Sequence, residues 1–193
     1  MIHRPLGTRS VALLAAVSMA ACVPAASRNA ASRPLPPGFD ARTVELRYYW
    51  VGMPGSREVD QTIRLERQGD TYTFTGTVEL QVGGTKAGPL PVTVPDSAML
   101  AFLRTLASAR RRQGVYHTIY THTDDYPEVT MTLRSDAGVV EFFSNSHSRE
   151  NWRVTIGGQQ YVSRSTAASD AWGISIPSPV ARTWTASWPR PGW

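Results

Sequence analysis

The sequence predicts one α+β domain, a mainly antiparallel β-sheet covered on one face by a single α-helix. Apolar and polar residues alternate over most of residues 42–164, as they do in strands that bury one face. One internal segment instead repeats its apolar residues every three or four positions, as an amphipathic helix does. Strands on both sides of one helix favour an antiparallel sheet with helical cover. The 193-residue chain is long enough for one such domain.

The first half of the domain is expected to contain three strands. In residues 43–50 the even-numbered positions are apolar and most odd-numbered ones are polar, so the even positions define the buried face. A hairpin follows over residues 61–82 and turns at Gly69 and Asp70. Its second strand has a regular apolar face made of Tyr72, Phe74, Gly76, Val78, Leu80 and Val82. Residues 83–91, GGTKAGPLP, predict a loop because Gly and Pro interrupt regular structure.

A helix is expected to start at Ser97, with Asp96 as its N-cap. Its apolar face comprises Met99, Phe102, Leu103 and Leu106. Arg110–Arg112 would occupy the last turn, where positive charge is favourable, and Gly114 would end the helix. The alternative for the arginine run is contact with an anionic lipid or cell-wall polymer.

The second half returns to strand patterns. Residues 115–120 are expected to be extended, and residues 129–144 to form a hairpin that turns at Ser135–Gly138. Residues 152–163 form a last expected hairpin around a Gly-Gly pair, with the apolar side of its first strand facing the core. The order of strands, one helix and more strands is the basis of the α+β prediction.

The C-terminal tail, residues 165–193, is expected to dock on the domain, with Trp184 and Trp188 as its binding residues. Val180, Trp184 and Trp188 would share one face of a helix, whereas Trp184, Ala186 and Trp188 would share one face of a strand. The secondary structure of the tail therefore stays open. Indole rings also favour protein interfaces and membrane surfaces, so binding to a partner or a membrane is the alternative.

Residues 1–21 are expected to be an export signal that is absent from the mature protein. They combine Arg4 and Arg9 with Val11–Ala21, an uncharged run of eleven mostly apolar residues. A transmembrane helix needs about 20 such residues, so this run is too short to be one. Loss of the signal lowers the formal net charge from +5 to +3, because both arginines leave with it.

The four residues Met19-Ala20-Ala21-Cys22 resemble the lipobox of bacterial lipoproteins, in which the cysteine becomes the lipid-modified N-terminus after cleavage. The resemblance implies that Cys22 carries a lipid anchor. The family usually has Leu in the place of Met19. Cys22 is also the only cysteine of the chain, and a solitary cysteine in a secreted protein calls for an explanation such as modification. Simple secretion, with cleavage after Ala25, is the alternative.

Residues 22–41 are expected to form a flexible tether, because their Ala, Ser, Arg and Pro offer little surface to bury. The protein would then lie in the cell envelope, lipid-anchored to a membrane on its periplasmic or other extracytoplasmic side. Basic residues are scattered apart from Arg110–Arg112, which argues against nucleic acid as a partner.

The stretch YHTIYTHTDDYPEVTMTL, residues 116–133, is the main candidate for a metal site. In an extended chain His122 and Asp124 point to the same face, so they are the candidate ligands. Zinc usually takes three or four protein ligands, so a further one would have to come from Asp125, Glu128 or His147. The alternative is structural: the two aspartates stabilise a turn before Pro127 through side-chain to backbone hydrogen bonds.

No motif points to an enzyme. The sequence contains neither a G-x-S-x-G elbow nor an S-x-x-K pair for a nucleophile, and GGTKAG lacks the spacing of a phosphate-binding loop. The favoured hypothesis is a non-enzymatic, membrane-tethered envelope lipoprotein that binds an envelope protein or another partner. One alternative is a metal-binding or hydrolytic domain centred on His122 and Asp124. Another is an inhibitor of an envelope or host enzyme, although small secreted inhibitors often rely on disulfides and this chain can form none.

The arrangement resembles an uncharacterised class of bacterial lipoprotein and periplasmic domains with early paired strands, one capped helix and a later hairpin. In that class a Thr-Asp-x-Pro lip opens the hairpin and an Asp/Gly turn closes it. The matching residues are Thr123, Asp124 and Pro127 for the lip, which is one residue longer here, and Asp136–Gly138 for the turn. The resemblance covers residues 43–163 and implies the same fold. It implies no activity.

Overall fold

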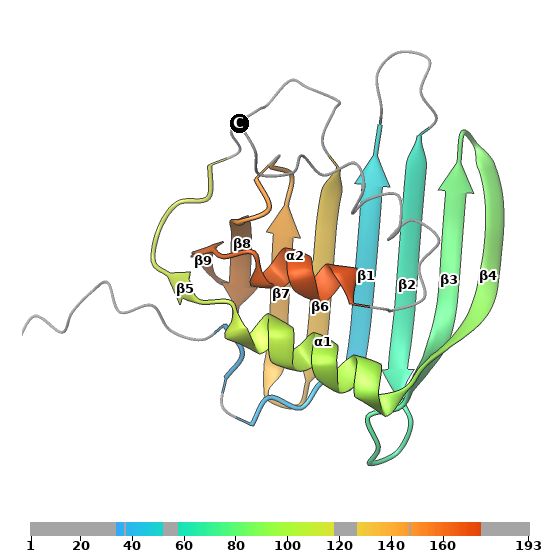
Figure 1. Ribbon diagram of the computed structural model, residues 1–193, viewed down its shortest axis with the longest axis horizontal. Helices are drawn as coiled ribbons and strands as arrows, with labels where there is room; N and C mark the ends of the chain where they lie inside the picture. The colour runs from blue at the N-terminus through green and yellow to red at the C-terminus, as the bar shows by residue number, and fades with distance from the viewer. Residues whose placement is uncertain (1–33, 37, 52–57, 118–126, 147, 175–193) are drawn as a thin grey trace, which may run out of the picture.

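A nine-stranded antiparallel sheet with two helices on one face forms the described part of the protein in the computed structural model (Figure 1). The structure describes residues 34–36, 38–51, 58–117, 127–146 and 148–174. The strands are β1 (Thr43–Trp50), β2 (Val59–Arg67), β3 (Phe74–Val82), β4 (Thr85–Val94), β5 (Arg111–Arg112), β6 (Glu128–Ser135), β7 (Gly138–Ser144), β8 (Asn151–Ile156) and β9 (Gln159–Arg164). The helices are α1 (Asp96–Ser108) and α2 (Ala167–Gly173). The strand order across the sheet is β4-β3-β2-β1-β6-β7-β8-β9-β5.

Pairing of β1 with β6 joins the early strands to the late ones and sets the centre of the core. Leu46 lies opposite Ile63 of β2 and opposite Met131 of β6, and all three side chains are buried. The neighbouring residues on each strand point to the other face, because successive side chains alternate in a strand. The predicted buried faces of β1, β3, β6 and β8 are therefore confirmed.

The predicted fold class, an α+β domain with one helix, is wrong, because the sheet dominates the structure and a second helix is present. The described part of the chain is dominated by the sheet, and α2 adds a second short helix beside α1. Helix α2 has only seven residues, AASDAWG, of which the three alanines and Trp172 are buried. Such a short segment does not contain enough turns to show a helical period, so the sequence pattern did not reveal it.

The predicted loop at residues 83–91 is also wrong, because these residues belong mostly to β4. Strand β4 lies at the edge of the sheet and pairs only with β3. Nearly all its residues are exposed, and it contains Pro89 and Pro91. Proline is tolerated at such an edge, since the outer side of an edge strand needs no donor for a neighbouring strand.

Helix α1 has the predicted buried face but different ends. Met99, Phe102 and Leu106 are fully buried, which confirms the helical stripe. The helix includes Asp96, and Pro95 is its N-cap without a side-chain cap hydrogen bond. Asp96 instead accepts a hydrogen bond from the hydroxyl of Thr73.

Arg110–Arg112 do not form the last turn of α1, which has no basic residue. Arg111 and Arg112 form β5 and pair with β9, and the Arg111 guanidinium lies 4.5 Å from the centre of the Tyr161 ring. Gly114 lies beyond β5 and does not end the helix.

No helix of the described chain is long and apolar enough to cross a membrane.

The chain packs against the core before β1 begins. Leu35 and Phe39 are partly buried against the core cluster, and Ala41 belongs to it. The packed part of the chain thus starts inside residues 22–41, the segment assigned above to the tether.

Candidate functional site

The residues predicted to carry function lie outside the described part of the chain. This holds for Cys22, for His122 and Asp124, and for Trp184 and Trp188. Among the described residues, no group of three or more His, Cys, Asp or Glu side chains could hold a metal ion.

The residues just before 118–126 nevertheless make defined hydrogen bonds. The Tyr116 hydroxyl donates to the Asn145 side-chain carbonyl and accepts from the Asn145 backbone N–H, both at 3.0 Å. The Asn151 amide donates to the His117 carbonyl at 3.2 Å. Burial raises the pKa of Tyr116, so this phenol stays protonated at neutral pH. The chain thus enters residues 118–126 beside the end of β7 and the start of β8.

A broad polar surface covers the face of the sheet opposite the helices, which we call the open face. Its side chains form cross-strand rows. One row contains Thr77, Arg64, Glu45, Thr132, Glu141 and Thr155, and the next contains Glu79, Thr62, Arg47, Thr130, Phe143 and Arg153. Threonine and alternating charges favour a hydrated strand surface, and opposite charges on neighbouring strands stabilise the pairing.

Ion pairs hold several of these side chains in place. Arg47 makes two hydrogen bonds to the Asp60 carboxylate, at 3.2 Å from Nε and 3.0 Å from Nη2. This bidentate pair raises the pKa of Arg47, because Asp60 stabilises the charged guanidinium. Arg64 bridges Glu45 at 3.3 Å and Glu79 at 3.0 Å across three neighbouring strands.

A third pair lies on the late strands. Arg153 approaches Glu141 to 3.5 Å, and its guanidinium lies 4.3 Å from the centre of the Phe143 ring. The Tyr116 ring meets Phe143 edge-on, with the ring centres 6.0 Å apart. Tyr116, in the chain that follows β5, therefore covers Phe143 on the open face, whereas over β1 Tyr49 lies beside Arg47, with 5.6 Å between the guanidinium and the ring centre.

A shallow depression of about 390 Å³ lies on the open face over β1, β2, β3 and β6. Its polar lining consists of Thr43, Glu45, Arg64, Glu66, Thr75 and Arg134. Arg134 and Glu66 are exposed, and no ion pair joins either of them to another described residue. The depression therefore offers one positive and one negative group to a ligand, beside an Arg64 that already has partners.

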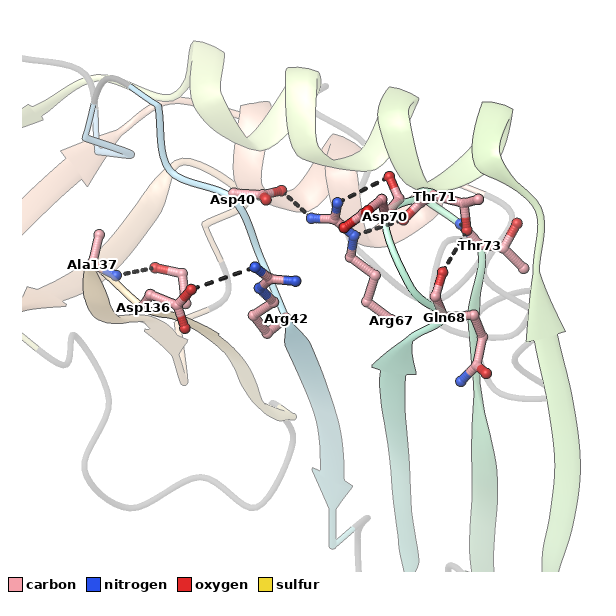
Figure 2. A network of polar contacts seen from close by, with 10 residues as sticks. Asp40, Arg42, Arg67, Gln68, Asp70, Thr71, Thr73, Asp136 and Ala137 are labelled. Atoms are coloured by element: carbon pink, nitrogen blue, oxygen red, sulfur yellow. Dashed lines mark hydrogen bonds and ion pairs between the residues drawn. The ribbon is translucent and has the colours of Figure 1, made fainter.

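Arg67 organises the end of the sheet next to this depression (Figure 2). Its guanidinium donates to the Asp40 carboxylate, to the Thr71 carbonyl at 2.6 Å and to the Asp70 carbonyl at 3.1 Å. It also lies 5.0 Å from the centre of the Tyr72 ring. One side chain thus ties the segment before β1 to the turn between β2 and β3.

The Asp40 carboxyl gives this cluster a testable pH dependence. Its pKa is held below the usual 3.8, mainly by the hydrogen bond from Arg67. A depressed folded-state pKa contributes stability above the unfolded value, and that stability is lost as pH falls through the folded value. We expect Asp40→Asn to destabilise the protein at about pH 7 and to lose this effect by about pH 2. Urea unfolding at both pH values measures it. An equal deficit at both would show that Asp40 acts by packing alone.

The alternation of side chains along each strand indicated which of them face outward. The sequence patterns did not reveal three other features of the site. No sequence pattern indicated that Arg64 pairs with Glu45 and Glu79, that Arg67 binds both Asp40 and the β2–β3 turn, or that Arg134 borders a depression. Each depends on which residues of separate strands lie opposite one another. The arrangement suits binding of a polar surface by hydrogen bonds and charge.

Comparisons of the chain with protein-family models, curated proteins and solved structures found no match. The resemblance drawn from the sequence pattern therefore stays a prediction, and the function has to be argued from the residues themselves.

Proposed function

We propose that the protein is a non-enzymatic, membrane-tethered envelope lipoprotein whose open face binds a polar partner. The observation that carries the proposal is the depression at Arg134 and Glu66, set within a face on which Arg47, Arg64 and Arg153 are held by ion pairs. Side chains that are already ordered lose little entropy when a partner binds. A partner with carboxylate and ammonium or guanidinium groups would complement Arg134 and Glu66, which no ion pair joins to another described residue.

The position at which the predicted tether joins the domain supports anchoring through Cys22. Asp40 is bound at the turn between β2 and β3, at the end of the sheet where β1 starts (Figure 1). Leu35 lies thirteen positions after Cys22, and an extended chain of this length spans at most about 45 Å. A lipid at Cys22 would hold the domain within that distance of the membrane, with the end of the sheet that bears the depression nearest to the tether.

Lipid anchoring predicts a large change in location for Cys22→Ala. We expect the wild-type protein in the membrane fraction and the variant in the soluble envelope fraction, because the variant has no thiol to acylate. Fractionation followed by immunoblotting measures this. Met19→Leu is the matched control, since it restores the usual lipobox residue and should leave the protein in the membrane fraction. A Cys22→Ala variant that stays wholly with the membrane would refute lipid anchoring.

Partner binding through the open face predicts a selective effect of Arg134→Glu. We expect the yield of cross-linked envelope partners to fall about tenfold, since reversing one charge in a contact typically costs 1 kcal/mol or more, and 1.4 kcal/mol corresponds to about tenfold. In-cell cross-linking with quantitative mass spectrometry measures it. Arg104→Glu, on the exposed side of α1, makes the same charge change away from the open face. Equal losses for both variants would place the binding surface elsewhere.

The competing function is a metal site at His122 and Asp124, with His147 as a further ligand. The observation that favours it is the contact of Tyr116 with Asn145, because it brings the start of residues 118–126 next to the segment that contains His147. Untagged protein distinguishes the two proposals. We expect no bound zinc and no thermal shift with added zinc. A stoichiometric metal that is lost in His122→Ala would establish the competing function instead.

A further inference from the structure

The upper part of the helix-bearing face carries a group of buried and partly buried side chains that lies away from the ribbons of both helices (Figure 1). Tyr48, Gln61 and Leu80 lie side by side on β1, β2 and β3, and Trp50 and Val59 form the next row. Tyr48 is 5% and Gln61 is 1% exposed, and the other three are partly buried against the core. We call these five residues the upper core face.

The positions of the helices do not explain this burial. Helix α1 crosses the lower ends of the strands, and α2 passes in front of β7 and β6 and ends in front of β1 (Figure 1). The upper ends of β1, β2 and β3 lie beyond both helices in this view. Side chains that are almost fully buried need atoms above them, and the distance of both helices from this area favours cover by another segment of the chain.

The apolar area continues to the edge of the sheet. Leu90 of β4 lies opposite Val78 of β3 and is 53% exposed. Val78 is buried and belongs to the core cluster. An exposed leucine that borders a buried row extends the surface available to a docking segment.

The end of α2 is directed toward the upper core face. Gly173 ends the helix, and Ile174 adopts an extended conformation with φ −68° and ψ 138°. Ile174 is partly buried against the core, so the chain is still in contact with the domain where its described part ends. Nineteen residues follow, 175–193.

The composition and length of these nineteen residues fit the surface. They contain Ile176, Val180, Trp184 and Trp188 and no acidic residue. An extended segment of this length reaches about 60 Å, whereas β1 and β4 are about 14 Å apart at a strand spacing of about 4.8 Å. Tryptophan buries a large apolar area, which suits a surface of this kind.

The other segments fit less well. Residues 118–126 follow Tyr116, whose ring contacts Phe143 on the open face, so that segment starts from the opposite side of the sheet. Residues 52–57, GMPGSR, join β1 to β2 but offer Met53 as their one large apolar side chain. Residues 1–33 precede the segment that Arg67 holds at the opposite end of the sheet. We therefore infer that residues 175–193 dock on the upper core face and cover it, as a permanent part of the domain. This inference is independent of the open face and of lipid anchoring.

Photo-cross-linking in the full-length protein tests this docking directly. A photoreactive amino acid replaces Leu80, and the cross-linked peptides are identified by mass spectrometry. We expect an intramolecular cross-link to residues 175–193, at a yield at least about tenfold above that from position 77. Thr77 is the matched control, because it lies on the same strand but on the open face. A Leu80 cross-link to residues 52–57 or 118–126, to a second copy of the chain or to another protein would overturn the inference, and so would the absence of any cross-link.

A second measurement uses the tail itself. Trp184→Ala combined with Trp188→Ala should increase amide hydrogen exchange at Gln61 and Leu80 at least about tenfold, while exchange in β8 and β9 stays unchanged. The reason is that loss of the covering side chains lowers the free energy of local opening. Unchanged exchange at Gln61 and Leu80 would overturn the docking. A uniform increase over all strands would also overturn it, since it would show a general loss of stability without a local cover.

Discussion

Replacing Trp152 by alanine should lower the free energy of unfolding by about 3–5 kcal/mol, the range seen for buried Trp or Phe changed to alanine. Trp152 is 0% exposed and is the largest fully buried side chain of the described protein. Its indole N–H donates to the Arg149 carbonyl at 2.9 Å. The Ser169 hydroxyl of α2 donates to the same carbonyl at 2.7 Å. Loss of the indole would thus leave a cavity and weaken the contact between α2 and the segment before β8.

One further variant separates the effect of the cavity from that of the lost hydrogen bond, and another serves as a surface control. Trp152→Phe keeps much of the volume but removes the N–H, so we expect it to cost less than Trp152→Ala. Val139→Ala changes a side chain that is 39% exposed, so its effect should stay within about 0.5 kcal/mol. Chemical denaturation gives all three values. A loss below about 1 kcal/mol for Trp152→Ala would mean that the core around β8 collapses into the space without penalty.

The buried faces of the strands could be predicted because each strand packs one side against the core. Leu46, Phe74 and Val154 alternate with outward-facing neighbours and are all buried. A period of two is a local property, and a few residues are enough to show it. The core was therefore readable from the sequence even though the fold class was not.

The proportions of helix and strand could not be predicted, because the sequences of β4 and α2 show only weak strand and helix patterns. Strand β4 contains Gly88, Pro89 and Pro91, which are typical of loops, and only its edge position permits them. Helix α2 packs through small alanines, and α1 and α2 contact each other on the same face of the sheet. Tertiary contacts, more than intrinsic propensity, decide both elements.

The candidate site was predictable only in part, because it depends on register. Parity showed that Glu45 and Arg64 point away from the core, but their pairing requires that β1 and β2 align residue 45 with residue 64. The connection between these strands sets that alignment, and its geometry is not encoded in a simple pattern. The depression near Arg134 needs a further alignment, that of β1 with β6.

Gly76→Ala should lower the free energy of unfolding by about 3 kcal/mol, at the upper end of the usual cost of overpacking. Gly76 was predicted only as one more position on the apolar face of β3. In the structure a Cβ at this position would lie 1.8 Å from the backbone oxygen of Arg64 and 2.9 Å from the Cα of Leu65. A backbone carbonyl in a paired strand cannot move away without disturbing the β2–β3 ladder, so β2 would have to shift.

Gly114→Ala is the matched control for this substitution. There a Cβ would meet the Cγ2 of Val162 at 2.9 Å, and a side-chain methyl group can move more easily than a backbone. We expect Gly114→Ala to cost less than about 1 kcal/mol. Urea unfolding compares the two variants, and hydrogen exchange should show faster opening of β2 and β3 only in Gly76→Ala. Since β2 carries Arg64, Glu66 and Arg67, the same variant should also distort the depression on the open face. Equal and small costs for both glycines would show that β2 accommodates the methyl group, and that the close approach of Gly76 is not needed to align the site.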